Sequence, residues 1–268
     1  MTNDLSVSIF QADLIWENPT ANRKNFDRLF ELMVSDIDVI VLPEMFTTGF
    51  SMEPAKVAEK FHPENMVTLN WMRSHAVVCD AVICGSVSVE DDGKFYNRLL
   101  WVRPDGSYSY YDKRHTFTFA GEDKVFTRGD KLLIEQWRGW KICPLICYDL
   151  RFPVWSRNRL IQGKPMYDAL IYVANWPAVR REPWLKLLPA RAIENQAYVM
   201  GCNRVGEDNN QHTYSGDSLF IDPRGEFLLA PGTTTDEILT FKLSSKELSD
   251  FRLKFPVLED GDGFDISL

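Results

Sequence analysis

The sequence predicts a protein of the α/β class with an α+β layered arrangement, in which two β-sheets pack face to face between outer helices. This four-layer α-β-β-α sandwich follows from many short strand-type segments combined with about four sizeable helical segments. No linker, repeat or low-complexity tract interrupts residues 1–250, which indicates a single domain. A Rossmann-type sheet is the competing arrangement, but no GxGxxG motif follows the first predicted strand. Residues 251–268 are expected to form a C-terminal tail, either loose or packed on a partner subunit.

The N-terminal third shows the strand–helix–strand order of a βαβ-like unit. Residues 5–10 form an apolar strand, and residues 22–34 carry apolar side chains at helical spacing. Thr20 is the expected N-terminal cap of that helix. Residues 37–42 are a nearly continuous apolar strand, which Pro43 ends.

The middle of the chain repeats this pattern and then becomes irregular. Glycine-containing turns separate the strands at 81–89 and 95–102, and the segment from 110 to 129 lacks clear periodicity. Long irregular segments inside a compact domain are commonly functional. The remaining predicted elements of this region are a helix at 65–76, strands near 132–135 and 140–146, and a helix at 154–160.

The C-terminal half adds further strands and two helices. A buried strand at 168–176 is followed by a helix that Pro183 can begin, because proline fits the first helical turn. The other predicted elements are a strand at 198–205, a hairpin of 218–222 and 226–230, a strand at 237–241, and a helix at 245–251 capped by Ser244.

Composition limits the function classes. With 45% hydrophobic and 25% charged residues, the chain is typical of a soluble globular protein. A net charge of −8 argues against a nucleic-acid or anionic-membrane partner. The chain shows no basic-then-apolar leader pattern and no membrane-length apolar run, so we expect no signal peptide and no membrane span. The five cysteines form no CxxC pair and the four histidines lack metal-ligand spacing, which favours a reduced cytoplasmic protein without a structural metal.

Cys147 lies where a buried strand ends and the predicted 154–160 helix approaches. Backbone N–H groups and the positive end of a helix dipole at such a junction favour a thiolate. A thiolate beside free N–H donors is suited to acyl transfer. The alternatives are a buried inert cysteine or a redox sensor, although Cys143 is not placed as a resolving partner.

Three further polar residues are candidates for the site, either because burial of their charge would be costly or because they lie in a loop beside aromatic residues. Glu44 follows an apolar run, and a buried glutamate must be paired or protonated. Lys113 and Glu122 lie in the irregular segment. Their structural alternatives are an ion-paired or capping Glu44 and a solvated Lys113. Taken together with Cys147, however, they provide a base, a cation and a nucleophile.

The chain resembles the nitrilase (carbon–nitrogen hydrolase) superfamily, whose Glu–Lys–Cys triad has this order. The matching segments cover nearly the whole chain: 42–50 (LPEMFTTGF), 96–97 (YN), 111–115 (YDKRH), 146–153 (ICYDLRFP), 174–177 (ANWP), 191–196 (RAIENQ) and 214–218 (YSGDS). The resemblance implies the layered sandwich, no cofactor, a homodimer or larger assembly, and Glu122 as the glutamate that keeps Lys113 in place. Within the superfamily the chain is most similar to omega-amidases, which deamidate 2-oxoglutaramate and 2-oxosuccinamate.

This resemblance implies hydrolysis of a small-molecule amide through a thioester. Glu44 would take the thiol proton as Cys147 attacks, while Lys113 and the backbone N–H of Tyr148 would stabilise the oxyanion. Arg151 is expected to bind the distal carboxylate of the substrate, with pairing to Asp149 or to another structural carboxylate as its alternative. The aromatic residues expected to line the pocket are Phe119, Tyr148 and Trp176, whose structural alternative is a place in the core.

Other functions remain open at this point. Another amidase of the same superfamily, acting on N-carbamoyl or simple aliphatic amides, is the nearest alternative, and nitrile hydrolysis is a more distant one. A non-catalytic ligand-binding or scaffold protein on the same fold is an alternative of a different class. The complete set of Glu44, Lys113 and Cys147 argues against that last function, because binding alone does not need a base beside a thiol.

Overall fold

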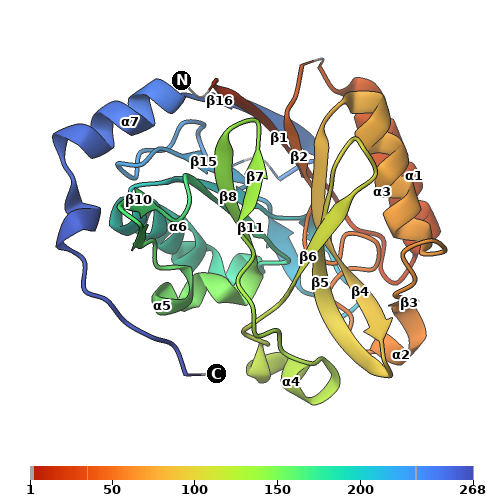
Figure 1. Ribbon diagram of the computed structural model, residues 1–268. Helices are drawn as coiled ribbons and strands as arrows, with labels where there is room; N and C mark the ends of the chain where they lie inside the picture. Colours follow the sequence, from red (N-terminus) through yellow and green to blue (C-terminus); the bar gives the residue numbers. More distant parts are fainter. Residues whose placement is uncertain (1–2, 35, 233, 268) are drawn as a thin grey trace.

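Two β-sheets face each other in the computed structural model, which describes residues 3–34, 36–232 and 234–267 (Figure 1). Helices α1 (Pro19–Leu32) and α3 (Val67–Cys79) lie on the outer face of one sheet. Helix α6 (Arg181–Asn195) covers the outer face of the other. The predicted single-domain α-β-β-α sandwich is therefore confirmed.

The first sheet contains the N-terminal strands. Val39 and Val41 of β2 point into the core between the sheets, whereas Ile40 points into the core beneath α1 and α3. This alternation is the two-residue period of a strand with both faces buried. The central strands β1, β2 and β4 are parallel to one another. Strands of this sheet follow the order β16 (Glu237–Leu243), β1 (Leu5–Gln11), β2 (Val39–Val41), β4 (Val82–Asp91), β5 (Lys94–Val102) and β6 (Tyr108–Asp112), with β3 (Glu59–Lys60) pairing beside β4.

The second sheet has parallel central strands and receives α6 on its outer face. Gly201 makes that close approach possible, because an added Cβ would lie 2.7 Å from both Leu188 Cδ1 and Trp184 Cζ2. Short pairs lie outside it, β9 (Leu160–Ile161) with β10 (Lys164–Pro165) and β13 (Val205–Glu207) with β14 (Thr213–Ser215). The strand order is β15 (Leu219–Ile221), β12 (Tyr198–Cys202), β11 (Ala169–Val173), β8 (Trp140–Ile146) and β7 (Glu135–Trp137).

Two local predictions differ from the structure. Asn18, not Thr20, caps α1, since its side chain accepts a hydrogen bond from the Ala21 N–H and Pro19 occupies the first helical turn. The helix predicted at 154–160 is confirmed only in its first turn: a 3₁₀ turn η2 (Cys147–Arg151) leads into the four-residue α5 (Pro153–Ser156), and the chain then becomes extended. Asn158 explains the ending, because its side chain bonds the backbone at Tyr167 and Asn195 instead of continuing the helix.

The predicted irregular segment contains short turns rather than long elements. After β6 come the 3₁₀ turn η1 (Thr118–Ala120) and the one-turn helix α4 (Glu122–Val125). The predicted 218–230 hairpin is reduced to β15 and a single bridge between Ile221 and Phe227. The other short elements are α2 (Pro54–Val57) and η3 (Ala178–Arg180).

Ser244 caps the last helix as expected, accepting a hydrogen bond from the Glu247 N–H. That helix, α7 (Ser245–Lys254), extends three residues beyond its predicted end and is followed by η4 (Val257–Asp260). The segment after η4 runs back along the same chain, where Arg159 donates a hydrogen bond to the Phe264 carbonyl (Figure 1). Within the described ranges, no helix has the length and apolar character needed to cross a membrane.

Candidate active site

Three buried charged side chains form a cluster between the two sheets. The Lys113 ammonium donates to Glu44 Oε1 at 2.9 Å and to Glu122 Oε1 and Oε2 at 3.0 and 2.9 Å. All three side chains are essentially inaccessible to solvent. Asn97 joins the two carboxylates, because its Nδ2 donates to Glu44 Oε1 at 2.8 Å and lies 3.4 Å from Glu122 Oε1. The structure thus brings together three of the residues singled out from the sequence.

Glu44 is held where the chain leaves β2. The next residue, Met45, has a φ of +42°, a left-handed conformation that non-glycine residues rarely adopt. Its N–H is bonded to Ser86 Oγ, which secures the turn. The backbone N–H of Asn175 donates to Glu44 Oε2 at 2.8 Å, so a residue that follows β11 of the second sheet orients a carboxylate from the first.

Backbone contacts place the other two members of the cluster. The Lys113 N–H donates to the Asn97 carbonyl, continuing the pairing of β5 with β6, and the Lys113 carbonyl accepts from Gly129 N–H. Glu122 begins α4 after Gly121, whose φ of +77° favours glycine. The Phe117 N–H donates to Glu122 Oε2, which ties the irregular segment back onto its own glutamate.

Cys147 lies at the C-terminal end of β8, on a strained turn. Its φ is +42°, and the turn is held by the buried carboxylate of Asp149. Asp149 Oδ2 accepts hydrogen bonds from Tyr111 OH and from the Ile146 N–H, at 2.8 and 3.1 Å. Asp149 Oδ1 accepts from the His115 N–H at 3.0 Å and lies 2.8 Å from His115 Nδ1. A cysteine projected from a strand end in this way is exposed on one side to a ligand.

The site electrostatics differ from the prediction that the junction favours a thiolate. Burial, reinforced by the charge of Glu44, raises the pKa of the Cys147 thiol well above its ordinary value, although Lys113 opposes the shift. The helices after Cys147 have only a turn each, so they carry little dipole to offset these effects. The raised pKa therefore favours a neutral thiol for the resting cysteine.

The charges of Lys113 and Glu122 act on each other across their direct contact. Burial by itself would lower the pKa of Lys113, but the charges of Glu122 and Glu44 outweigh it and raise that pKa above its ordinary value. Burial raises the pKa of Glu122, and the charge of Lys113 opposes this. Lys113 thus stays positively charged in a buried site, where a cation stabilises developing negative charge strongly.

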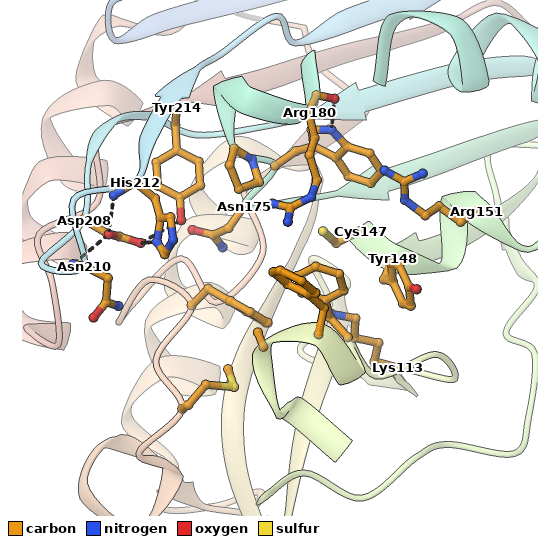
Figure 2. Close-up of a pocket in the computed structure, with 17 residues that line it drawn as sticks. Lys113, Cys147, Tyr148, Arg151, Asn175, Arg180, Asp208, Asn210, His212 and Tyr214 are labelled. Atoms are coloured by element: carbon orange, nitrogen blue, oxygen red, sulfur yellow. Dashed lines mark hydrogen bonds and ion pairs between the residues drawn. The ribbon is translucent and has the colours of Figure 1, made fainter. Parts of the chain in front are cut away.

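A cavity of about 340 Å³ opens directly over Cys147 and Lys113 (Figure 2). This volume is at the small end of the range for ligand pockets, about 300–1,000 Å³. Aromatic side chains line much of it, and Figure 2 shows the side chains of Asn175, Arg151 and Arg180 around Cys147. The cavity suits a small ligand that is polar at its ends.

The four residues predicted to contact substrate all line this cavity. Trp176 is 3% exposed and forms a wall, whereas Phe119 is 81% exposed and lies at the rim. Tyr148 packs between Phe117 and Phe152, with ring centroids 4.9 and 5.1 Å away. The Arg151 guanidinium lies over the Trp176 ring, 5.0 Å from its centroid. The alternative in which Arg151 pairs with Asp149 is wrong, because the described residues contain no such ion pair and other donors occupy that carboxylate.

Sequence reasoning missed several residues of the site. Asn97 was noticed only as part of a matching segment, and its link between the two glutamates depends on folding of β5 against α4. Arg180 was not singled out, although it follows the Asn175–Pro177 motif by only a few residues. The far wall was also missed: it includes Asp208, whose carboxylate accepts from Tyr214 OH and lies 3.2 Å from His212 Nδ1 (Figure 2).

No group of three or more His, Cys, Asp or Glu side chains in the described chain is arranged to hold a metal ion. The donors of the cluster at the base of the cavity are instead directed at one another, as the Lys113 contacts show.

Comparison with known proteins gives consistent results over nearly the full length. Residues 6–253 match the family described as carbon–nitrogen hydrolase. The omega-amidase YafV of Escherichia coli is 46% identical over 260 residues, which cover 97% of this chain and 98% of that protein. The 2-oxoglutaramate amidase of Bacillus subtilis is 32% identical over 257 residues, covering 95% of this chain and 96% of that protein. Among solved structures, XC1258 of Xanthomonas campestris, a CN-hydrolase superfamily protein, is 40% identical with a TM-score of 0.95, covering 98% of this chain and 99% of that one.

Proposed function

The chain belongs to the carbon–nitrogen hydrolase family, and we propose that it is an omega-amidase that releases ammonia from the terminal amide of 2-oxo-dicarboxylic acid monoamides. Similarity to the omega-amidase of Escherichia coli over nearly the full length supports this activity, as does similarity to a 2-oxoglutaramate amidase. The proposed substrates are 2-oxoglutaramate and 2-oxosuccinamate, and the products are the 2-oxo acid and ammonia.

The observation that carries the proposal is the buried cluster in which the Lys113 ammonium donates to Glu44 and Glu122, at the base of a cavity that Cys147 lines. In this arrangement Glu44 takes the thiol proton as sulfur attacks the amide carbon. The negative charge that develops on the amide oxygen is stabilised by Lys113 and by the Tyr148 N–H. An oxyanion donor of this kind contributes about 3 kcal/mol.

Collapse of the tetrahedral intermediate breaks the carbon–nitrogen bond. Protonated Glu44 returns its proton to the leaving nitrogen, so that ammonia departs and a thioester on Cys147 remains. Glu44 then removes a proton from a water molecule that attacks the thioester carbonyl, and the thiol leaves as the acid forms. The same carboxylate serves both half-reactions because it lies against the thiol and is fixed by Asn97 and Asn175.

Glu122 acts as a positioning residue in this scheme. Both of its oxygens accept hydrogen bonds from the Lys113 ammonium. Glu122 therefore holds that cation within hydrogen-bond distance of Glu44. Its raised pKa also allows it to share a proton with the cluster during turnover.

Selectivity for an acidic amide is assigned to Arg151. Its guanidinium lies over the Trp176 ring, and such a contact leaves the planar N–H fork free for a carboxylate. Phe119, Tyr148 and Trp176 surround the carbon chain between the two polar ends. A substrate with its amide at Cys147 and its carboxylate at Arg151 satisfies both ends of the cavity.

An ammonia-release assay tests the proposed function. Turnover should be highest on 2-oxoglutaramate and far lower on propionamide, N-carbamoyl amino acids and propionitrile, each at equal concentration. The Cys147→Ala variant should show no turnover, and Cys143→Ala, a buried cysteine of the preceding strand, serves as its matched control. Appreciable activity in Cys147→Ala would contradict the assigned nucleophile, and a preference for carbamoyl or neutral amides would contradict the assigned substrate class.

We also propose that the enzyme is a homodimer in the cytoplasm. All five cysteines are free thiols, which supports a reducing compartment. Light scattering of the purified chain at micromolar concentration tests the assembly, since a mass equal to that of one chain would contradict it.

A further inference from the structure

Two arginines face the cavity with guanidinium groups that have no partner carboxylate. Among the described residues, neither Arg151 nor Arg180 forms a side-chain hydrogen bond or ion pair, and each instead lies over aromatic rings. The other charges of the cavity are already engaged. Lys113 is bonded to two glutamates, and Asp208 accepts from backbone and side-chain donors.

Arg180 is fixed at the rim of the cavity by its own backbone and by two rings. Its carbonyl accepts a hydrogen bond from the Trp176 indole N–H at 2.6 Å. Its guanidinium carbon lies 5.3 Å from the Phe117 ring centroid and 5.2 Å from that of Phe119. Stacking of this kind neutralises no charge, so the positive charge remains available to a ligand.

Trp176 fixes the two arginines relative to each other. Arg151 lies over its ring, and Arg180 is bonded through its carbonyl to the indole nitrogen. The Trp176 backbone is in turn held on both sides by Asn203, which accepts from the Trp176 N–H and donates to the Trp176 carbonyl. Two cations anchored to one buried, hydrogen-bonded tryptophan form a preorganised anion site.

We propose that Arg180 is a second substrate-binding cation, which together with Arg151 holds the 2-oxo acid end of the substrate while the amide lies at Cys147. The inference rests on the proposed function and extends it. Arg151 by itself accounts for one carboxylate, whereas a 2-oxo acid presents a carboxylate and an adjacent carbonyl oxygen in one plane. Two planar guanidinium groups can donate to both, and a simple acid amide lacks the second acceptor.

The competing role for Arg180 is structural. Its contacts with Phe117 and Phe119 could serve only to hold the η1 segment, which carries the backbone N–H that orients Glu122. Loss of such a structural contact would lower the turnover of every amide by a similar factor, because Lys113 would be misplaced for all of them. Loss of a substrate-binding cation would instead raise KM by a factor that depends on which groups the substrate carries.

Three amides separate these roles: 2-oxoglutaramate, its neutral methyl ester, and glutaramate, which keeps the carboxylate but lacks the oxo group. Steady-state kinetics should show that Arg180→Ala raises KM for 2-oxoglutaramate about 10- to 100-fold, with kcat changed much less. The increase should be smaller for glutaramate and nearly absent for the methyl ester. Arg180→Lys, which keeps the charge but loses the planar fork, should lie between wild type and Arg180→Ala.

Arg159→Ala is the matched control, because Arg159 also lies over a phenylalanine, Phe264, but outside the cavity. It should leave all three substrates unaffected. An equal change in kcat/KM for the three amides in Arg180→Ala would overturn the proposal and favour the structural role.

A binding measurement distinguishes failure of this inference from failure of the proposed function. If the wild-type enzyme did not prefer 2-oxoglutaramate, the proposed substrate would be wrong. The Arg180 site would still be tested by binding of 2-oxoglutarate to Cys147→Ala, followed through tryptophan fluorescence. Weaker binding after adding Arg180→Ala, with no change after adding Arg159→Ala, supports the site, and equal binding in both double variants overturns it.

Discussion

Replacing Asp149 by asparagine tests how the nucleophile turn is held. Tyr111 OH must donate to residue 149, because the phenolic oxygen already accepts from Trp155 Nε1 at 3.0 Å and from the Arg114 N–H at 3.2 Å. The Ile146 N–H also needs an acceptor on the same oxygen, Oδ2. The asparagine oxygen is therefore required at the Oδ2 position, and its NH₂ group must take the Oδ1 position.

At that position the NH₂ group can donate to His115 Nδ1, but the His115 N–H loses its acceptor. An unpaired donor of this kind costs about 1–3 kcal/mol, and loss of charge assistance in the remaining bonds adds about 1 kcal/mol. The expected decrease in the free energy of unfolding is about 2–4 kcal/mol. Asp149→Ala, which removes all the acceptors, should cost more.

Urea denaturation measures this difference, and Asp222→Asn provides the control. Asp222 also accepts two backbone N–H bonds, but in an exposed turn, so its loss should cost less than about 1 kcal/mol. At a temperature where Asp149→Asn stays folded, kcat should fall about 10- to 100-fold, because the turn carries Cys147 and the Tyr148 N–H. An unfolding free energy within about 0.5 kcal/mol of wild type would refute the reasoning.

Three other changes test the site and the core. Glu44→Gln should abolish amide hydrolysis. It should nevertheless speed the labelling of Cys147 by iodoacetamide at pH 8, because it removes a negative charge that raises the pKa of the thiol. Slower labelling would contradict that electrostatic explanation. Gly129→Ala should lower both the urea midpoint and activity, since its Cβ would lie 2.1 Å from the Asp112 carbonyl oxygen, beside Lys113; a wild-type midpoint would contradict this steric argument. The free energy of unfolding should also fall above a pH of about 8.5, because the unfolded chain releases thiol protons that the native state retains. The retained protons belong to the buried thiols whose pKa values are raised, those of Cys84, Cys143, Cys147 and Cys202. An unchanged urea midpoint between pH 7.5 and 10 would contradict these raised pKa values.

The sheets could be predicted from local sequence because their strands are short apolar runs ended by proline or polar residues. Residues 37–42 and 140–146 illustrate this, and the candidate site residues Glu44 and Cys147 come just after these two runs. The helix predicted at 154–160 ends early for a reason outside the segment itself. Asn158 bonds the backbone of Tyr167 and Asn195, nine and 37 residues away, and those partners cannot be read from helical periodicity.

The roles of Glu44, Lys113 and Cys147 remain predictions to be tested, but their proximity is a finding of the tertiary structure. The resemblance also pointed to Glu122 and included Asn97 in a matching segment without a role, whereas Arg180 carries no local signal of function. Asn97 matters because β5 packs beside α4, and Arg180 matters because η3 faces η1 across the cavity.

The sequence by itself determined the layered fold and the residue types available for acyl transfer. Both follow from local properties, namely the periodicity of apolar residues and the proline or polar residues that end the strands. Only the tertiary structure decided the charge state of the site. Burial and the neighbouring Glu44 keep the Cys147 thiol protonated, while two carboxylates keep Lys113 charged. Both effects depend on distances between segments far apart in the chain, and Coulomb energies in a buried site change steeply with those distances.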